Sequence, residues 1–309
     1  MAGADIFASP VIAGGTVVVG SYDDNVYALD AKTGDERWRF HTGDDVVSSA
    51  AVANGVVFVG SLDGKLCALD ADNGKKQWQF SAGDFIGSPA IDGDVVYIGS
   101  WDGNLYAINT STGDELWRFP TGAEIYASPT AGAGKVFIGN TFGTFVALDE
   151  ETGAKAWNRE IVNGVLSSAA TAARVVYVGG GAGDLYALDA EGGGVIWQFQ
   201  AGQRISSSQA VTGGTIFVGC DDGILYALDA TTGKKRWTFA TGAEIFSSPG
   251  VAHGTVFVGG LDGFVNAVDV TTGKQRWRYD LMSKIDASPA VEGNDLYIGS
   301  VDGTFVAIR

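Results

Sequence analysis

Ala-Leu-Asp-Ala-Lys-Thr-Gly-Asp-Glu-Arg-Trp, residues 28–38, is the stretch around which the whole sequence is organised. Its pattern of Ala, Asp, Thr-Gly and Trp returns six more times. The seven tryptophans that end the pattern lie 39 or 40 residues apart, at Trp38, Trp78, Trp117, Trp157, Trp197, Trp237 and Trp277. A fixed period of this length is typical of repeat architectures, in which each unit buries its apolar face against its neighbours.

A second series of residues indicates one more unit. Serines recur with the same period at Ser9, Ser49, Ser88, Ser128, Ser168, Ser208, Ser248 and Ser288. Alanines do so at Ala28, Ala68, Ala107, Ala147, Ala187, Ala227, Ala267 and Ala307. The sequence therefore contains eight units, the last of which stops before its tryptophan. We expect residues 1–309 to form a single domain.

Composition excludes some classes of function. The net charge of −16 argues against a nucleic-acid partner, because a phosphate backbone attracts a basic surface. No apolar run is long enough to span a membrane and no signal peptide is recognisable, which leaves the localisation open. Cys67 and Cys220 fall in the second and sixth of eight units, so we expect two separate thiols.

Each unit is expected to contain four antiparallel strands. In the first unit these are Ile6–Ala13, Thr16–Ser21, Asn25–Ala31 and Glu36–Thr42. The second strand contains a β-branched run, as in strands that are covered on both faces, and the third alternates its side chains between two faces. Four strands in every 40 residues, repeated around an axis, make an all-β propeller with eight blades.

The turns fit this architecture. Asp-Gly pairs such as Asp63-Gly64 and Asp222-Gly223 separate the second and third strands, and Asp-Gly favours tight hairpins with positive φ. Thr-Gly pairs separate the third and fourth strands. We assign these aspartates to turn geometry and to no chemical role.

Prolines indicate which strand lies innermost. Five of the six prolines fall at one position of the first strand, at Pro10, Pro89, Pro129, Pro249 and Pro289. Proline is tolerated where a strand edge has no partner, so the first strand is expected to face the central tunnel. Small residues lie two positions earlier, as expected where eight strands converge: Ala8, Ser48, Gly87, Ala127, Ser167, Ser207, Ser247 and Ala287.

The two ends of the sequence do not supply an eighth tryptophan strand. Residues 2–7 align with residues 241–246, which already follow a fourth strand. We therefore expect the eighth blade, Lys284–Arg309, to have three strands and to leave its third strand as an exposed edge. Either a segment upstream of Met1 or a neighbouring molecule would cover that edge.

The Ala-x-Asp-x-x-Thr-Gly-x-x-x-Trp spacing resembles the tryptophan-docking motif of quinoprotein propellers. That family includes alcohol dehydrogenases that use pyrroloquinoline quinone, BamB-like assembly proteins and propellers attached to some bacterial kinases. The resemblance covers essentially the whole sequence and departs at three motifs, where Asn109, Asn73 and Gly192 replace the usual residues. It implies that each indole docks between blades, over the Thr-Gly turn, with its N–H bonded near the alanine of the motif.

Candidate binding residues lie where the first strand of each blade begins. Four positions before the serines stand five carboxylates and two cations, at Asp5, Asp45, Asp84, Glu124, Arg204, Glu244 and Lys284. This ring at the tunnel mouth could bind a metal ion, a cationic group or an anion, or it could be a solvated rim. Tyr22, Trp101 and Phe142 belong to the same face and form either a contact patch or covers for their own hairpins.

Two functions remain. The first is a non-catalytic scaffold that binds a protein partner or senses a small ligand at the tunnel-mouth face, with no cofactor and no catalytic residues. The alternative is a quinoprotein alcohol dehydrogenase, whose family holds its cofactor and Ca²⁺ over the tunnel beside two adjacent cysteines. The sequence has no adjacent cysteines, and its even units leave no room for the insertions that build such a site. We expect the first function.

Overall fold

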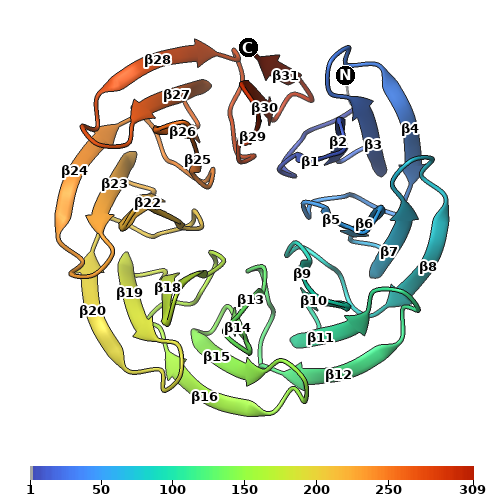
Figure 1. Ribbon diagram of the computed structural model, residues 1–309, viewed down its shortest axis with the longest axis horizontal. Coiled ribbons are helices and arrows are strands. Elements are labelled where there is room, and N and C mark those ends of the chain that lie inside the picture. The colour runs from blue at the N-terminus through green and yellow to red at the C-terminus, as the bar shows by residue number, and fades with distance from the viewer. Residues whose placement is uncertain (1–2) are drawn as a thin grey trace.

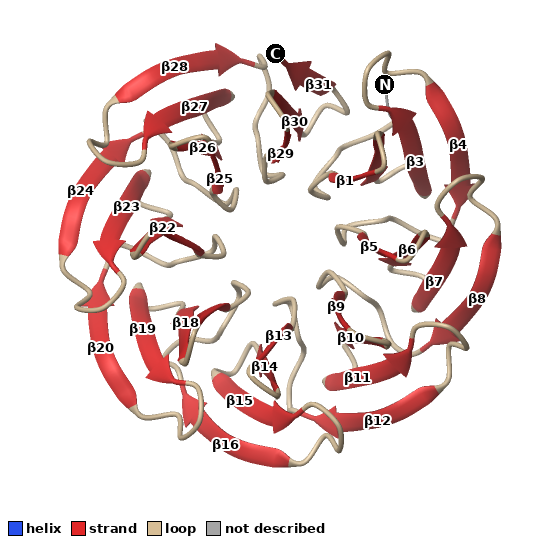
Figure 2. Cartoon of the chain, in the orientation of Figure 1, coloured by secondary structure: helices blue, strands red, loops and turns tan. Residues whose placement is uncertain are grey.

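The computed structural model describes residues 3–309 as eight small sheets arranged in a ring around a central tunnel (Figure 1). Seven sheets have four antiparallel strands and the last has three, and the described residues contain no helix (Figure 2). The predicted eight-bladed all-β propeller with an incomplete eighth blade is therefore confirmed. No helix in residues 3–309 is long and apolar enough to cross a bilayer.

Strands at equivalent positions have nearly equal lengths in all blades. The innermost strands are β1 (Val11–Ala13), β5 (Ala51–Ala53), β9 (Ala90–Asp92), β13 (Thr130–Gly132), β17 (Ala170–Ala172), β21 (Ala210–Thr212), β25 (Gly250–Ala252) and β29 (Ala290–Glu292). The second strands are β2 (Thr16–Gly20), β6 (Val56–Gly60), β10 (Val95–Gly99), β14 (Lys135–Gly139), β18 (Val175–Gly179), β22 (Thr215–Gly219), β26 (Thr255–Gly259) and β30 (Asp295–Gly299).

The third and fourth strands complete each blade toward the outer rim. The third strands are β3 (Asn25–Asp30), β7 (Lys65–Asp70), β11 (Asn104–Asn109), β15 (Thr144–Asp149), β19 (Asp184–Asp189), β23 (Ile224–Asp229), β27 (Phe264–Asp269) and β31 (Phe305–Ile308). The outer strands are β4 (Glu36–His41), β8 (Lys76–Ser81), β12 (Glu115–Pro120), β16 (Lys155–Glu160), β20 (Val195–Gln200), β24 (Lys235–Ala240) and β28 (Gln275–Asp280).

The innermost strand is shorter than the sequence predicts. Strand β1 begins at Val11 rather than Ile6, and in all five blades that have the proline, the strand starts directly after it. Proline has no N–H to offer to a ladder and is therefore tolerated just before this start. The three blades without the proline begin their inner strands at the same position, at Ala51, Ala170 and Ala210, so the start is set by the geometry of the repeat. The residues before the proline form the connection that enters the blade, and the predicted inner position of the first strand is correct (Figure 1).

The second-to-third strand turns also differ in detail from the prediction. In blade two, the loop has four residues, 61–64, and the Gly64 N–H donates to the Ser61 carbonyl at 3.2 Å. Gly64 has a φ of 73°, whereas the φ of Asp63 is not positive. The aspartate carboxylate accepts from the Lys65 N–H at the end of the turn and, outside the turn, from the Gly43 N–H, both at 3.0 Å. It therefore fastens the turn to the connection from the previous blade.

The apolar core lies between blades. Its largest cluster combines buried residues of three consecutive blades, among them Tyr97, Phe137 and Val176. Both faces of the second strands are covered, which explains their β-branched composition. Each blade is therefore stabilised by its neighbours rather than by a core of its own.

Six of the seven indoles bridge adjacent blades in the same way. Trp157 Nε1 donates to the Ala190 carbonyl of the next blade at 3.0 Å, and the other five make the equivalent bond at 2.8–3.1 Å. The acceptor is the residue after the aspartate of the motif, three positions beyond its alanine. The ring lies on the glycine of the Thr-Gly turn, where a Cβ on Gly193 would come within 2.7 Å of Trp157.

A circle of hydrogen bonds closes the inner circumference. The Ser9 N–H donates to the Ser49 hydroxyl at 2.8 Å, and each following serine donates in the same way to the next blade. The Ser288 N–H completes the circle by donating to Ser9 Oγ at 2.9 Å, across 279 residues of sequence. The serines that mark the eight units are thus the residues that join them.

Candidate functional site

The predicted ring residues all lie beside the turns between second and third strands, on one face of the propeller. The main-chain carbonyl of each accepts a hydrogen bond from an N–H in the turn of its own blade, at 2.9–3.1 Å. The donors are Tyr22, Leu62, Trp101, Thr141, Asp221, Leu261 and Val301 for Asp5, Asp45, Asp84, Glu124, Arg204, Glu244 and Lys284, respectively. The seven residues therefore share one face, with one residue in each of seven blades.

The side chains of this ring are spread out rather than gathered. Within residues 3–309, no hydrogen bond or ion pair joins two of the seven. Arg204 pairs with Asp221 of its own blade, with 2.8 Å between Nε and Oδ2. The Glu124 carboxylate accepts from the Thr141 hydroxyl at 3.1 Å. The ring is thus a charged rim, and a single ion cannot contact all of it.

The three predicted contact aromatics behave differently from one another. Phe142 is 78% exposed, and Trp101 is 36% exposed and packs against Tyr126 with ring centroids 5.4 Å apart. Tyr22 instead folds over Phe7, at 4.7 Å between centroids. Burial, together with the nearby carboxylates of Asp45, Asp286 and Asp5, raises the pKa of its phenol. Trp101 and Phe142 therefore face solvent, whereas the Tyr22 ring is partly buried against Phe7.

The sequence interpretation missed a second ring two positions further along each connection. A cavity of about 510 Å³ at the mouth is lined by residues of five blades: Tyr126, Leu166, Arg204, Ser206, Phe246 and Asp286. Five of these six stand at this second position, and Arg204 belongs to the outer ring. Most residues at this second position of the repeat are apolar, and Ser206 and Asp286 are the exceptions. Burial raises the pKa of the Asp286 carboxyl.

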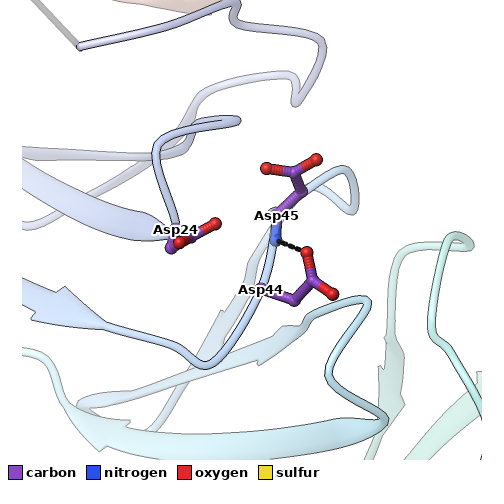
Figure 3. Close-up of side chains that lie close together, drawn as sticks. All are labelled: Asp24, Asp44 and Asp45. Carbon is purple, nitrogen blue, oxygen red and sulfur yellow. Dashed lines mark hydrogen bonds between the residues drawn. The ribbon is translucent and has the colours of Figure 1, made fainter.

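One group of carboxylates does lie close together. Oxygens of Asp24, Asp44 and Asp45 lie within 4.8 Å of one another, where the first turn meets the connection to blade two (Figure 3). Burial and the charges of Asp24 and Asp44 raise the pKa of Asp45.

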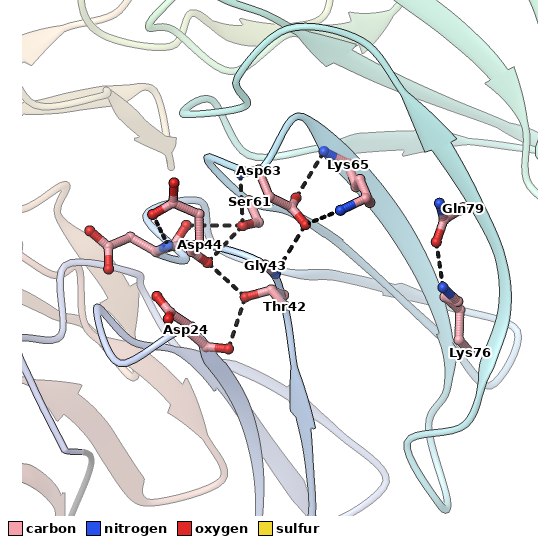
Figure 4. Close-up of polar contacts among 10 residues, drawn as sticks. Asp24, Thr42, Gly43, Asp44, Ser61, Asp63, Lys65, Lys76 and Gln79 are labelled. Carbon is pink, nitrogen blue, oxygen red and sulfur yellow. Dashed lines mark hydrogen bonds and ion pairs between the residues drawn. The ribbon is translucent and has the colours of Figure 1, made fainter.

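Hydrogen bonds fix the backbone of this group. Thr42 Oγ1 donates to the carbonyls of Asp24 and Asp44, and Ser61 Oγ donates to Asp44 (Figure 4). Oxygen ligands of this type suit hard cations.

Comparison with known proteins assigns the family. The profile of the family described as outer membrane protein assembly factor BamB matches residues 2–84, 81–198 and 181–309. The chain belongs to this family. None of the curated protein sequences compared with the chain matches it.

Solved structures similar to this BamB-family propeller include different kinds of protein. BamB from Moraxella catarrhalis has a TM-score of 0.85 at 21% identity, with 98% of this chain and 96% of that chain covered. The computationally designed Ika8 protein has 0.89 at 18%, covering 98% and 96%. A quinohemoprotein alcohol dehydrogenase from Comamonas testosteroni has 0.82 at 17%, covering 98% and 71%. At these identities the likeness shows the shared fold.

The residues that line the mouth cavity do not fit a quinone with Ca²⁺. Asp286 is the single carboxylate among the residues that line the cavity, and the cation Arg204 lines the same cavity. Ca²⁺ takes six to eight oxygen ligands, several of them from carboxylates. Cys67 and Cys220 are both free and buried, in blades two and six, so no adjacent cysteine pair lies at the mouth.

Proposed function

We propose that this BamB-family propeller is a non-catalytic scaffold that binds a protein partner on its tunnel-mouth face. The observation that carries the proposal is a set of exposed aromatics from two adjacent blades on this face, the aromatic patch of Trp101, Tyr126 and Phe142. Trp101 and Tyr126 are in contact, and Phe142 follows Thr141, which bonds the Glu124 side chain near Tyr126. Large aromatics that stay exposed on one face mark an interaction surface.

Charge around the patch narrows the kind of partner. Asp84 and Glu124 lie at the same blades as the patch, and the chain as a whole carries a net charge of −16. A partner that presents apolar side chains within a basic surface would complement both features. Sensing of a small ligand at the mouth cavity is the second form of the same proposal, because Phe246, Leu166 and Asp286 line a space of ligand size.

The proposal is supported by membership of the BamB family and by the misfit between the mouth and a quinone site. Like BamB from Moraxella catarrhalis, the chain consists almost wholly of propeller, since the alignment covers 96% of that protein. The alcohol dehydrogenase neighbour is longer, with 71% of its chain covered. Part of that dehydrogenase therefore has no counterpart in these 309 residues.

A photo-crosslinking experiment tests the binding face. Benzoylphenylalanine placed at Phe142 would capture the partner, whose affinity is then measured with purified proteins. The Trp101→Ala/Phe142→Ala variant is expected to bind at least about tenfold more weakly, because exposed aromatics at the centre of an interface carry much of its free energy. Reversing the charges of Asp45, Asp84 and Glu124 together is expected to slow association.

The matched control uses exposed side chains elsewhere on the propeller. Leu116 and Ile196 are half exposed on the outer strands β12 and β20. The Leu116→Ala/Ile196→Ala variant should bind within about twofold of the unmodified chain. If the outer-strand variant loses affinity and the patch variant does not, the binding face is the outer rim and the proposal is wrong.

A further inference from the structure

The third strand of the eighth blade has an outward edge that no strand covers within residues 3–309 (Figure 1). Ala307 of β31 is exposed, whereas its counterpart is fully buried in all seven other blades: Ala28, Ala68, Ala107, Ala147, Ala187, Ala227 and Ala267. In those blades the outer strand covers this position, with Ala267 facing Trp277, for example. The complete blades therefore show how a fourth strand would pair with the open edge of β31.

Two cavities flank this edge, one on each face of the incomplete sheet. The cavity toward blade one measures about 420 Å³ and is lined by Leu29, Ala31, Gly34, Tyr297 and Phe305, among others. The cavity toward blade seven measures about 480 Å³, and Phe257, Trp277 and Ile308 are part of its lining. Arg309 lines both cavities, and the two cavities with the β31 edge between them are called the edge groove.

Gly34 marks a docking site for an indole that no side chain of residues 3–309 fills. In six other blades, a Cβ on the equivalent glycine would lie 2.6–2.8 Å from a tryptophan ring: Gly74, Gly113, Gly153, Gly193, Gly233 and Gly273. Gly34 has the same left-handed backbone, with a φ of 77°, and nothing lies within 4 Å of its Cβ position. The turn is therefore already in the docking conformation.

The hydrogen-bond acceptor for such an indole is also in place. By the register of the repeat it is the Ala31 carbonyl, which accepts from the Tyr297 hydroxyl at 3.0 Å and from Arg309 at 3.4 Å. In blade four, the Glu150 carbonyl accepts from both Tyr97 and Trp117, so tyrosine and indole share this acceptor. The Arg309 side chain would have to move aside, which breaks its 3.4 Å contact with the Ala31 carbonyl and its 2.6 Å bond to the Lys32 carbonyl.

We propose that the edge groove binds an extended segment of a partner polypeptide that carries tryptophan in the pattern Thr-Gly-x-x-x-Trp-x-aromatic. Main-chain hydrogen bonds would add the segment to β31 as a fourth strand, and its indole would lie on Gly34. Six of the seven outer strands have Phe or Tyr two residues after Trp, which defines the last position of the pattern. The Thr-Gly turn would cover Trp277, which is 37% exposed and donates to no acceptor within residues 3–309.

A synthetic peptide tests this proposal. The probe is residues 229–242 of the chain itself, labelled with fluorescein at its N-terminus and titrated with the full chain while anisotropy is recorded. Saturable one-to-one binding is expected. The same peptide with Trp237→Ala has an unchanged charge and is expected to bind at least about tenfold more weakly, which corresponds to a loss of about 1.4 kcal/mol.

Two variants of the propeller locate the site. Gly34→Ala places a methyl group where the indole would lie and is expected to weaken binding at least about tenfold. Gly93→Ala is the matched control, since Gly93 also has a left-handed backbone with nothing within 4 Å of its Cβ position, but belongs to blade three. It should bind like the unmodified chain. Circular dichroism verifies that both variants are folded.

Three outcomes would overturn the proposal. The Trp237→Ala peptide could bind as tightly as the original, which would mean that charge alone drives association. Gly34→Ala could retain full affinity, which would place the peptide elsewhere. Finally, sedimentation could show a dimer that Gly34→Ala dissociates, in which case a second copy of the chain occupies the groove. None of these outcomes depends on the aromatic patch, so the proposed function is tested separately.

Discussion

Asp24 occupies a turn position that glycine holds in the other seven blades. Its φ is 63°, and the glycines that replace it have φ values of 73–99°: Gly64, Gly103, Gly143, Gly183, Gly223, Gly263 and Gly303. A left-handed conformation costs an L-residue about 1–2 kcal/mol, somewhat less for aspartate. The carboxylate is in addition held near Asp44 and Asp45. Both effects oppose folding.

Asp24→Gly is therefore expected to stabilise the protein by about 1 kcal/mol at pH 7. The raised pKa of Asp45 means that the folded protein keeps a proton that the unfolded chain has already released, so stability falls as pH rises through that range above about pH 4. Removing the Asp24 charge lessens this fall. The gain, measured by urea unfolding, should be larger at pH 7 than at pH 4.

Asn54→Gly is the control for backbone strain alone. Asn54 also has a positive φ, of 52°, and lies outside the carboxylate group. Its substitution should give a gain that does not change with pH. If Asp24→Gly destabilises the protein, then Asp24 makes a favourable contact and this interpretation of the carboxylates fails.

At the scale of the strand, the seven tryptophans have unequal surroundings. Trp157 packs against Phe137 and Phe145 and donates to the Ala190 carbonyl. Trp277 packs against Phe257 but lacks an acceptor among the described residues. Trp157→Ala is expected to lower the free energy of unfolding by about 3 kcal/mol, near the lower end for a large core side chain because the ring is partly exposed.

Trp277→Ala should cost less than half as much, since it loses neither a hydrogen bond nor full burial. Urea denaturation of the two variants side by side makes the comparison. Equal losses would show that the tilted packing of each indole against a phenylalanine of its own blade accounts for the stability, and that docking on the next blade contributes little.

For the whole molecule, even blade lengths bear on the dehydrogenase alternative. The units remain 39 or 40 residues long, and the mouth cavity has one carboxylate in its lining. Titration with pyrroloquinoline quinone and Ca²⁺ is expected to produce no saturable absorbance change and no dye reduction by an alcohol. Tight binding accompanied by dye reduction would establish the dehydrogenase and overturn the non-catalytic proposal.

The sequence predicts the number of blades, the strand order and the open eighth blade, because each follows from the period. It does not predict details that depend on contacts between one blade and the connection from the previous blade. The strand around Pro10 is shortened because the preceding segment belongs to the connection that enters the blade. The Asp63 side chain bonds both its own turn, at the Lys65 N–H, and the connection from the previous blade, at the Gly43 N–H.

The candidate site is less accessible to sequence reasoning. Position within the repeat placed Asp45, Glu124 and Arg204 on one face, but it could not show that no hydrogen bond or ion pair joins two of the ring residues within residues 3–309. Asp24 and Asp286 were missed because each departs from its own position in the repeat, as a carboxylate where the series is glycine or mainly apolar. Comparing the units position by position would have singled out both.

The hydrogen bonds of the serine circle all run in one direction, whichever blade is counted as the first. Every N–H points the same way around the hole, and the bond from Ser288 to Ser9 is equivalent to the other seven. The hub consequently has no seam, although the rim has one at β31. A circularly permuted polypeptide that began in another blade would therefore keep the same circle of serine hydrogen bonds, and only the position of its two termini would change.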